Sequence, residues 1–258
     1  MIRTLFIIAG AALVLCLVSL GGAAALAGRD LDRHDWTWVV SEDETGDDSF
    51  RFERGKVSPD AVRTLAWTGG DTLAVDLPVD VTYVQGDKAG VTVSGPQTTI
   101  DRVRLVDGRL TLADGDHEDR GYVTLGRGGL RAWSETEKLR ITVTAPSVTS
   151  FRVGGSGDLT IEGYDRPAME LLIDGSGDVE ASGKARALKL RINGSGDADL
   201  AALTLADAVI DMQGSGDVSA GPTGVVEADL GGSGDLRLTR RPERLERNLS
   251  GSGDVIGG

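Results

Sequence analysis

The tetrapeptide Gly-Ser-Gly-Asp constrains the fold more than any other feature, because it recurs six times at nearly constant spacing in the C-terminal half of the chain. A repeat this regular indicates that one short supersecondary unit is copied and stacked. Successive copies start 18 to 20 residues apart, at Gly155, Gly175, Gly194, Gly214, Gly232 and Gly251. The spacing therefore predicts an architecture, and it names no reaction.

The residues on both sides of each copy alternate between apolar and polar, which is the pattern of a half-buried β-strand. After the tetrapeptide the alternation resumes, as at Leu159 and Ile161, and a return segment with Gly or Pro follows. Two sets of equivalent positions, which we call columns, precede the tetrapeptide, and they are apolar except for one arginine. The first column contains Phe151, Leu171, Leu190, Ile210, Ala228 and Arg247. The second contains Val153, Ile173, Ile192, Met212, Leu230 and Leu249.

Each repeat is therefore predicted to form a strand, a corner, a second strand and a return. One repeat of about 19 residues measures about 60 Å when extended at roughly 3.3 Å per residue, enough for two or three short sides. We predict an all-β fold, a right-handed, parallel β-helix-like solenoid with one coil per repeat. Arg247 breaks its apolar column in the last copy, and a polar terminal repeat is expected at the end of such a stack.

Residues 1–27 differ in composition from the rest of the chain. Arg3 precedes an uncharged run from Leu5 to Ala27, which ends in Ala25-Leu26-Ala27. This pattern predicts a helix that is either a signal peptide cleaved near Ala27 or a single-pass membrane anchor through residues 5–27. Because the basic flank lies at the N-terminus, both alternatives place the rest of the chain outside the cytoplasm, in the periplasm or cell envelope.

The remaining sequence divides into a predicted tether and a predicted domain. Residues 28–60 are polar and acidic and are expected to link the N-terminal segment to the folded part. Residues 61–258 are expected to form one β-helical domain, whose period-two runs begin near Thr64 and whose six repeats occupy 149–258. Residues 113–138 are rich in glycine and charge and are expected to form an inserted loop.

Composition and charge exclude several classes of function. The 37 glycines and 4% aromatic residues suit tight turns around a thin core. A net charge of −13 argues against nucleic acid or an anionic membrane surface as a partner, because both attract clustered Lys and Arg. Cys16 is the only cysteine and lies in the apolar run, so neither disulfides nor thiol chemistry are expected in the exported part.

A longer series of motifs resembles a known bacterial domain family. The segments VTYVQGDKAGVTVSG (81–95), VDGRLTL (106–112) and ITVTAP (141–146) precede the first corner, VGGSGD (153–158), in this order. From about Thr64 to the C-terminus, this order and the tandem corners resemble the putative auto-transporter adhesin head GIN domain. The resemblance implies a β-helical, envelope-associated protein without an established enzymatic activity, and it implies no catalytic residues.

The corner aspartates are the most conspicuous site candidates. Stacking would set them about 4.8 Å apart, where like charges repel by about 1 kcal/mol per pair even in water. One hypothesis makes each a structural clamp that accepts N–H groups from its own or a neighbouring corner, with glycines that permit positive φ. The alternative is a ladder of Ca²⁺ ions on the six carboxylates. Its ligands would be Asp158, Asp178, Asp197, Asp217, Asp235 and Asp254.

Catalytic patterns are scarce. His34 and His117 are the only histidines and have no spacing relationship, so neither a catalytic triad nor a zinc site is expected. The enzymatic alternative is a carbohydrate-active β-helix enzyme that cleaves polysaccharides with paired carboxylates of the 114–119 insert. The carboxylates in that insert are Asp114, Asp116, Glu118 and Asp119.

We therefore expect a non-enzymatic, exported envelope protein that needs no cofactor and serves in binding, adhesion or scaffolding. Its partner would be an envelope protein or a glycan, contacted through outward-facing columns. The charged residues expected on that surface are Arg152, Arg191, Arg237, Asp199, Asp211 and Asp229. The aromatic residues available to stack on sugar rings are Trp67, Tyr122, Trp133 and Tyr164.

Overall fold

The computed structural model describes residues 36–42, 50–54, 58–113, 121–126 and 129–257. The expected N-terminal helix at 1–27 and the acidic residues at 114–119 lie outside this part of the chain. Within the described part, no helix is long and apolar enough to cross a membrane. The chain divides into two compact units: Met1–Ala61 with Gly95–Thr99 and Asp114–Lys138, and Val62–Ser94 with Ile100–Ala113 and Leu139–Gly258.

The first unit contains a four-stranded antiparallel sheet in the order β10-β9-β1-β2. Its strands are β1 (Trp36–Glu42), β2 (Phe50–Arg54), β9 (Gly121–Gly126) and β10 (Gly129–Ser134). Strands β1 and β2 lie within the expected tether at 28–60, and β9 and β10 lie within the expected loop at 113–138. Each of these short strands is stabilised by pairing with its neighbours. Trp38 of β1, for example, lies opposite Arg54 of β2 and Val123 of β9.

A buried polar cluster also lies in this unit. It joins β9 to α3 (Gln97–Ile100) and to the chain before η1 (Thr136–Lys138). The carboxylate of Glu135, only 4% exposed, accepts hydrogen bonds from the hydroxyls of Thr98 at 2.6 Å, Thr99 at 3.0 Å and Tyr122. Three donors satisfy this buried acid, so the cluster has a structural explanation.

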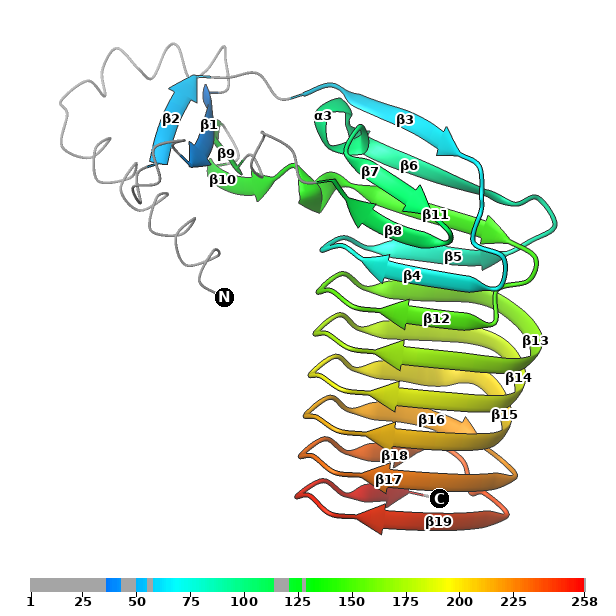
Figure 1. Ribbon diagram of the computed structural model, residues 1–258. Coiled ribbons are helices and arrows are strands. Elements are labelled where there is room, and N and C mark those ends of the chain that lie inside the picture. The colour runs from blue at the N-terminus through cyan, green and yellow to red at the C-terminus, as the bar shows by residue number, and fades with distance from the viewer. Residues whose placement is uncertain (1–35, 43–49, 55–57, 114–120, 127–128, 258) are drawn as a thin grey trace. The chain divides into compact units, whose positions relative to one another are not determined.

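The second unit is a β-solenoid of about five turns, and its coils stack along one axis in Figure 1. Each turn carries one strand before the Gly-Ser-Gly-Asp corner and one after it, and we call the resulting stacks the upstream and downstream ladders. The upstream ladder runs through β7 (Val103–Val106), β8 (Arg109–Leu112), β4 (Thr72–Asp76), β12 (Ser150–Val153), the C-terminal parts of β13 (Leu159–Ile173), β14 (Val179–Ile192) and β15 (Ala198–Met212), β17 (Val225–Leu230) and β19 (Arg244–Leu249).

The downstream ladder is built from the strands after each corner. It runs through β3 (Asp60–Leu65), β6 (Gly90–Pro96), β11 (Arg140–Ala145), β5 (Val81–Gln85), the N-terminal parts of β13, β14 and β15, β16 (Val218–Pro222), β18 (Leu236–Leu238) and β20 (Val255–Gly257). The coils are parallel and in register, with Leu159 opposite both Val81 and Val179. In the first three repeats the expected return segment is itself strand, because β13, β14 and β15 bend from one ladder into the other.

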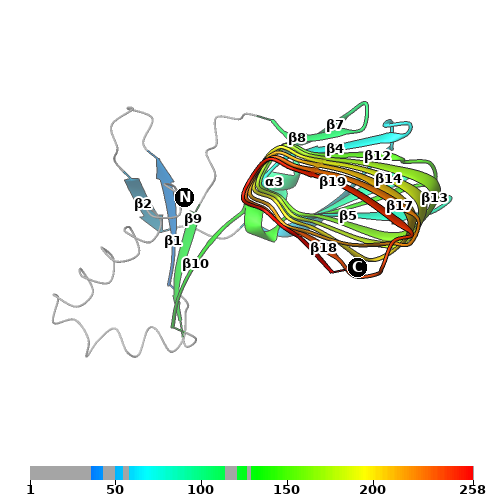
Figure 2. The same cartoon turned by 90° about the horizontal axis from the view of Figure 1, so that it is seen from below.

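The predicted inward columns form the core. Phe151 and Val153 before the first corner, and Leu159 and Ile161 after it, are each at most 1% exposed. The view along the axis in Figure 2 shows the coils superimposed, so each apolar residue packs on its equivalents in adjacent turns. At the first turn Phe151 makes edge-to-face contacts with two tyrosines, Tyr83 at 5.0 Å and Tyr164 at 5.9 Å between ring centroids. The expected solenoid is confirmed.

The two ends of the solenoid differ. At one end the parallel repeat is interrupted, because β7 is antiparallel to β8 and β6 is antiparallel to β11. At the other end β19 pairs with β17 and β20 pairs with β18, and every residue of β19 is exposed. Arg247 lies beside Ala228 in the column that is otherwise apolar. The terminal coil is therefore as polar and exposed as its sequence predicts.

Candidate functional site

The Gly-Ser-Gly-Asp corners stack backbone on backbone. A Cβ added to the first glycine of repeats two to six would lie closer than 3.0 Å to the carbonyl oxygen of the equivalent glycine one coil earlier, as between Gly194 and Gly175. These glycines are absent from the residues with positive φ. The expectation that they serve left-handed conformations is therefore wrong, and close approach of successive coils is what requires them.

The corner aspartates act as clamps between coils. The Oδ1 atom of each of the first five accepts a hydrogen bond from the backbone N–H of the next aspartate in the file. The N···O distances are 2.9 Å from Asp178 to Asp158 and 2.7 Å from Asp217 to Asp197. An N–H donor to an ionised carboxylate makes a strong, charge-assisted bond, which offsets repulsion along the file. The clamp hypothesis is confirmed in its inter-coil form.

The same file is the place where the calcium ladder was expected. Among the described residues, no group of three or more His, Cys, Asp or Glu side chains is arranged to hold a metal ion. One oxygen of each of the first five carboxylates already accepts an N–H group. Both hypotheses use the same side chains, and the geometry gives the first five aspartates a structural role as clamps.

The charged residues predicted to share one outward surface lie on two. Arg152, Arg191, Asp211 and Asp229 occupy one column of the upstream ladder, where each lies in register with the residue of the next coil. Asp199 and Arg237 belong to the downstream ladder, on either side of Ser219. The prediction of one surface is wrong, because a repeat contributes one strand to each ladder and the corner between them turns the chain.

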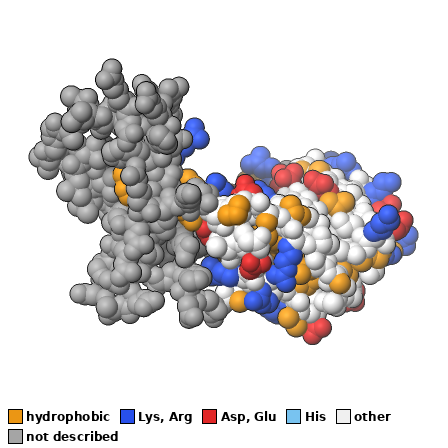
Figure 3. Space-filling model, turned by 90° about the horizontal axis from the view of Figure 1, so that it is seen from above, with side chains coloured by type: hydrophobic (Ala, Val, Ile, Leu, Met, Phe, Trp, Pro, Cys, Tyr) orange, Lys and Arg blue, Asp and Glu red, His pale blue; other side chains and the backbone are white. Residues whose placement is uncertain are grey.

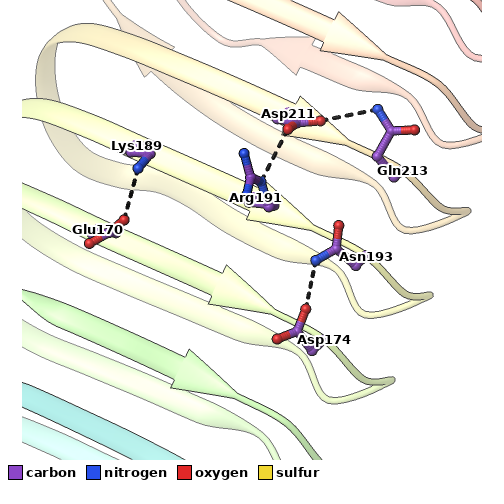
Figure 4. A network of polar contacts seen from close by, with 7 residues as sticks. All are labelled: Glu170, Asp174, Lys189, Arg191, Asn193, Asp211 and Gln213. Atoms are coloured by element: carbon purple, nitrogen blue, oxygen red, sulfur yellow. Dashed lines mark hydrogen bonds and ion pairs between the residues drawn. The ribbon is translucent and has the colours of Figure 1, made fainter.

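The upstream surface carries a network of polar contacts, most of which join neighbouring coils (Figure 4). Lys189 contacts Glu170 at 3.0 Å, and Arg191 contacts Asp211 at 3.1 Å. Asn193 donates to Asp174 at 2.6 Å, and Gln213 donates to Asp211 at 3.1 Å. Most charges on this surface therefore already have partners within the protein.

The downstream surface is hollowed. A depression of about 220 Å³ spans β15, β16, β18 and β20 and is lined by Asp197, Ala198, Asp199, Asp217, Val218, Ser219, Asp235, Arg237 and Ile256. Sequence reasoning identified Asp199 and Arg237 but missed Ser219 and Ile256. The column that follows each corner aspartate by two residues contains all four, and aligning that column would have found them.

Four aspartates and one arginine line the depression, so acidic groups predominate. Asp199 and Arg237 are two coils apart, or about 9 to 10 Å at the usual strand spacing. A carboxylate acceptor and a guanidinium donor at this distance suit a ligand several atoms long that carries both kinds of hydrogen-bonding group. Figure 3 shows the molecule from the side opposite to that of Figure 2. On the described surface in this view, acidic and basic side chains are interspersed with apolar ones.

The aromatic residues proposed for sugar stacking do not form an open platform. Tyr164 is buried, and its hydroxyl donates to the carbonyl oxygen of Ala168 at 2.5 Å. Tyr122 is also buried and stacks on Trp133 with 4.4 Å between centroids. The ammonium of Lys138 lies 3.5 Å from the centre of the Trp133 ring. Trp67 packs beside Gly69, where an added Cβ would meet its ring.

Burial changes the acidity of two core tyrosines. Tyr83 donates to the carbonyl oxygen of Ala145 at 2.8 Å, and both Tyr83 and Tyr164 are at most 1% exposed. Desolvation raises the pKa of each phenol above its ordinary value, and the Arg166 cation lowers it by a smaller amount. These hydroxyls therefore act as neutral donors inside the core.

The solenoid part of the chain matches one known protein family. The model of the putative auto-transporter adhesin, head GIN domain, matches residues 71–242, which are two thirds of the chain and contain most strands of both ladders and five of the six corners. This chain belongs to that family. The GIN family is described as adhesin-like and envelope-associated, and non-enzymatic function is consistent with that description. None of the curated proteins matches the chain.

Several solved structures are similar to this GIN protein. A putative adhesin from Bacteroides fragilis is 18% identical with a TM-score of 0.59, and the match covers 76% of this chain and 96% of that one. A putative lipid binding protein from Parabacteroides distasonis is 17% identical, with a TM-score of 0.44 and coverage of 77% and 97%. A putative adhesin from Parabacteroides merdae is 14% identical, with a TM-score of 0.44 and coverage of 77% and 96%. The first supports the solenoid fold of the GIN unit.

Proposed function

We propose that this GIN protein is a non-enzymatic, exported binding module of the cell envelope. Its ligand would be an envelope glycan or protein, held on the downstream ladder around Asp199, Ser219 and Arg237. The observation that supports this choice is the depression, because it is hollowed and lined by four aspartates and one arginine, most of which are exposed. The upstream ladder is less suited, since its charges are engaged with one another.

The rigidity of the scaffold also supports a binding role. The corner glycines and the aspartate clamps fix the spacing of successive coils, so the side chains of the downstream ladder keep a constant separation. A surface that is organised before the ligand arrives loses little conformational entropy on binding. Side-chain replacement at outward positions can then change specificity without changing the core.

A paired-variant binding experiment tests the proposal. The full-length protein would be titrated against envelope polysaccharides and against envelope proteins from the source bacterium. We expect Asp199→Ala with Arg237→Ala to weaken binding at least about tenfold, or roughly 1.4 kcal/mol. Arg191→Ala with Asp211→Ala is the matched control, because it removes an exposed base and a partly exposed acid from the upstream ladder.

Two results would contradict the proposal. Equal losses in both variants would show that the downstream depression has no special role. Release of oligosaccharides from a polysaccharide by the purified protein would support the enzymatic alternative instead. A dependence of that activity on Asp116 or Glu118 would assign it to the 114–119 insert.

A further inference from the structure

The last coil of the solenoid exposes a strand edge together with residues that would be core elsewhere. Leu245 is 36% exposed and Leu249 is 40% exposed, whereas their equivalents in β17, Val226 and Leu230, are at most 1% exposed. Among the strands that the structure describes, β19 pairs with β17 alone. An edge strand with adjacent apolar surface is a template for pairing with another chain.

The free edge of β19 presents the backbone groups of particular residues. Arg244 donates its N–H to Gly224, and Ser250 donates its N–H to Leu230. Because backbone groups alternate in direction along a strand, those of Leu245, Arg247 and Leu249 point away from β17. A second strand would therefore form hydrogen bonds with these residues.

The sequence of β19 is self-complementary in one antiparallel register. If Leu245 lies opposite Leu245 of a second copy, each Arg244 lies opposite a Glu246 of the other copy. Opposite charges directly across an antiparallel pair are stabilising, and like charges are destabilising. Shifting the centre to Glu246 or Arg247 would place two identical charges opposite one another. The charge pattern thus favours the register centred on Leu245.

We propose that two copies of this chain associate through antiparallel pairing of their β19 strands about a twofold axis at Leu245. A twofold contact closes on itself, whereas head-to-tail stacking of coils would continue into filaments. In the described strands at the opposite end of the solenoid, the parallel repeat is interrupted at β7–β8 and at β6–β11, so these strands offer no matching parallel edge. This inference is independent of the ligand-binding surface proposed on the downstream ladder.

Position-specific cross-linking tests the register. Leu245→Cys would be made in the full-length chain with its single cysteine, Cys16, replaced by serine. Residues directly opposite in a hydrogen-bonded antiparallel pair have Cα atoms about 5.5 Å apart, which is within the range of a disulfide. Asn248→Cys is the matched control, because the two copies of that residue would be about 20 Å apart along the paired strands.

We expect mild oxidation in detergent to convert the Leu245→Cys protein to a disulfide-linked dimer at least about tenfold faster than the Asn248→Cys protein. Arg244→Glu and Glu246→Arg, each added to Leu245→Cys, should slow cross-linking about fivefold or more, and the double swap should restore it. Equal rates for the two cysteines, failure of the double swap to restore the rate, or species larger than dimers by light scattering would overturn the proposal.

Discussion

The backbone N–H of Asp197 donates a hydrogen bond to Oδ1 of Asp178, its equivalent one coil earlier, at 2.8 Å. The same contact joins successive aspartates along the file, so each carboxylate satisfies a donor of the next coil. A bond of this kind to a charged acceptor contributes about 1.5 to 3 kcal/mol, while repulsion between exposed neighbouring carboxylates costs about 1 kcal/mol in water. The inter-coil bonds are therefore strong enough to offset the repulsion along the file.

Replacing Asp178 with alanine should test the clamp. The N–H of Asp197 would lose its acceptor, and water would compensate in part because the corner is exposed. We expect a loss of about 1 kcal/mol, which lowers the melting temperature by about 2–4 °C for a domain of this size. Differential scanning calorimetry of the full-length protein measures the change.

Two further variants control for loss of charge. Asp178→Asn keeps Oδ1 and should retain most of the stability. The part of the stability that it loses should depend on ionic strength. Asp254→Ala removes the last aspartate of the described file, for which no inter-coil acceptor contact is seen in that part of the chain. If Asp254→Ala lowers the melting temperature as much as Asp178→Ala does, the inter-coil clamp is not the cause of the lost stability.

Alanine at two glycines should separate close packing from backbone conformation. Gly194→Ala would push its Cβ into the carbonyl of Gly175, and a backbone atom cannot rotate away. We therefore expect a loss of about 3 kcal/mol, at the upper end of the usual range for overpacking. Gly163 has a φ of +64° and open space around its added Cβ. Gly163→Ala should cost only about 1–2 kcal/mol of conformational strain.

Urea denaturation of both variants, monitored by circular dichroism, provides the comparison. If Gly163→Ala is the more damaging variant, stacking of the corners is not what selects glycine. Ser195→Ala, at the exposed middle position of the corner, should leave the denaturation midpoint unchanged and serves as the control.

The repeat made most of the solenoid predictable from sequence, and the corner chemistry only in part. Columns such as Phe151 and Val153 identify buried positions because alternation and period act together. The role expected of the glycines is wrong, because a sequence does not reveal why a glycine is needed. It can be needed to adopt a positive φ or to allow the close approach of a neighbouring coil. That distinction depends on the distance between Gly194 and Gly175, which are 19 residues apart.

The strands of the first unit show a different limit. Residues 36–42 and 121–126 pair with each other across a long stretch of sequence, with Trp38 opposite Val123. Each run is short and flanked by charged or glycine-rich segments, so local patterns favoured a tether and a loop. The assignment of Asp199 and Arg237 to one surface with Arg191 failed for a related reason, because the corner separates residues that are close in sequence.

The ion pair between Arg191 and Asp211 should contribute little to stability. Their side chains are 52% and 31% exposed, so solvent screens the attraction. In a double-mutant cycle with Arg191→Ala and Asp211→Ala, we expect a coupling energy below about 1 kcal/mol that decreases with added salt. A coupling that is larger, or independent of salt, would contradict the view that these charges are exposed surface contacts.

Calcium should not stabilise the corners appreciably. Because the first five aspartates already accept inter-coil N–H groups, a cation would have to share or displace these contacts. We expect millimolar Ca²⁺ to leave the melting temperature unchanged and to give no saturable heat in a calorimetric titration. A saturable heat that disappears in Asp197→Asn would revive the calcium ladder.

The buried tyrosines should make the solenoid sensitive to alkali. Burial raises the folded-state pKa of Tyr83 and Tyr164 above the unfolded value near 10, so folding favours the neutral phenols. Their contribution is fully present below about pH 10 and is lost as pH rises through the folded-state pKa values. Each pH unit above 10 should remove up to about 1.4 kcal/mol per tyrosine.

Paired variants distinguish this titration from a general loss of stability. Tyr83→Phe with Tyr164→Phe removes both phenols, and with them the hydrogen bonds to Ala145 and Ala168, at a cost of about 1 kcal/mol each near neutral pH. The double variant should nevertheless lose stability less steeply above pH 10 when urea midpoints are measured across the alkaline range. Phe151→Leu weakens the same aromatic cluster without removing a titrating group, so it should keep the wild-type slope. Equal slopes for the double tyrosine variant and the wild type would place the alkaline transition elsewhere in the protein.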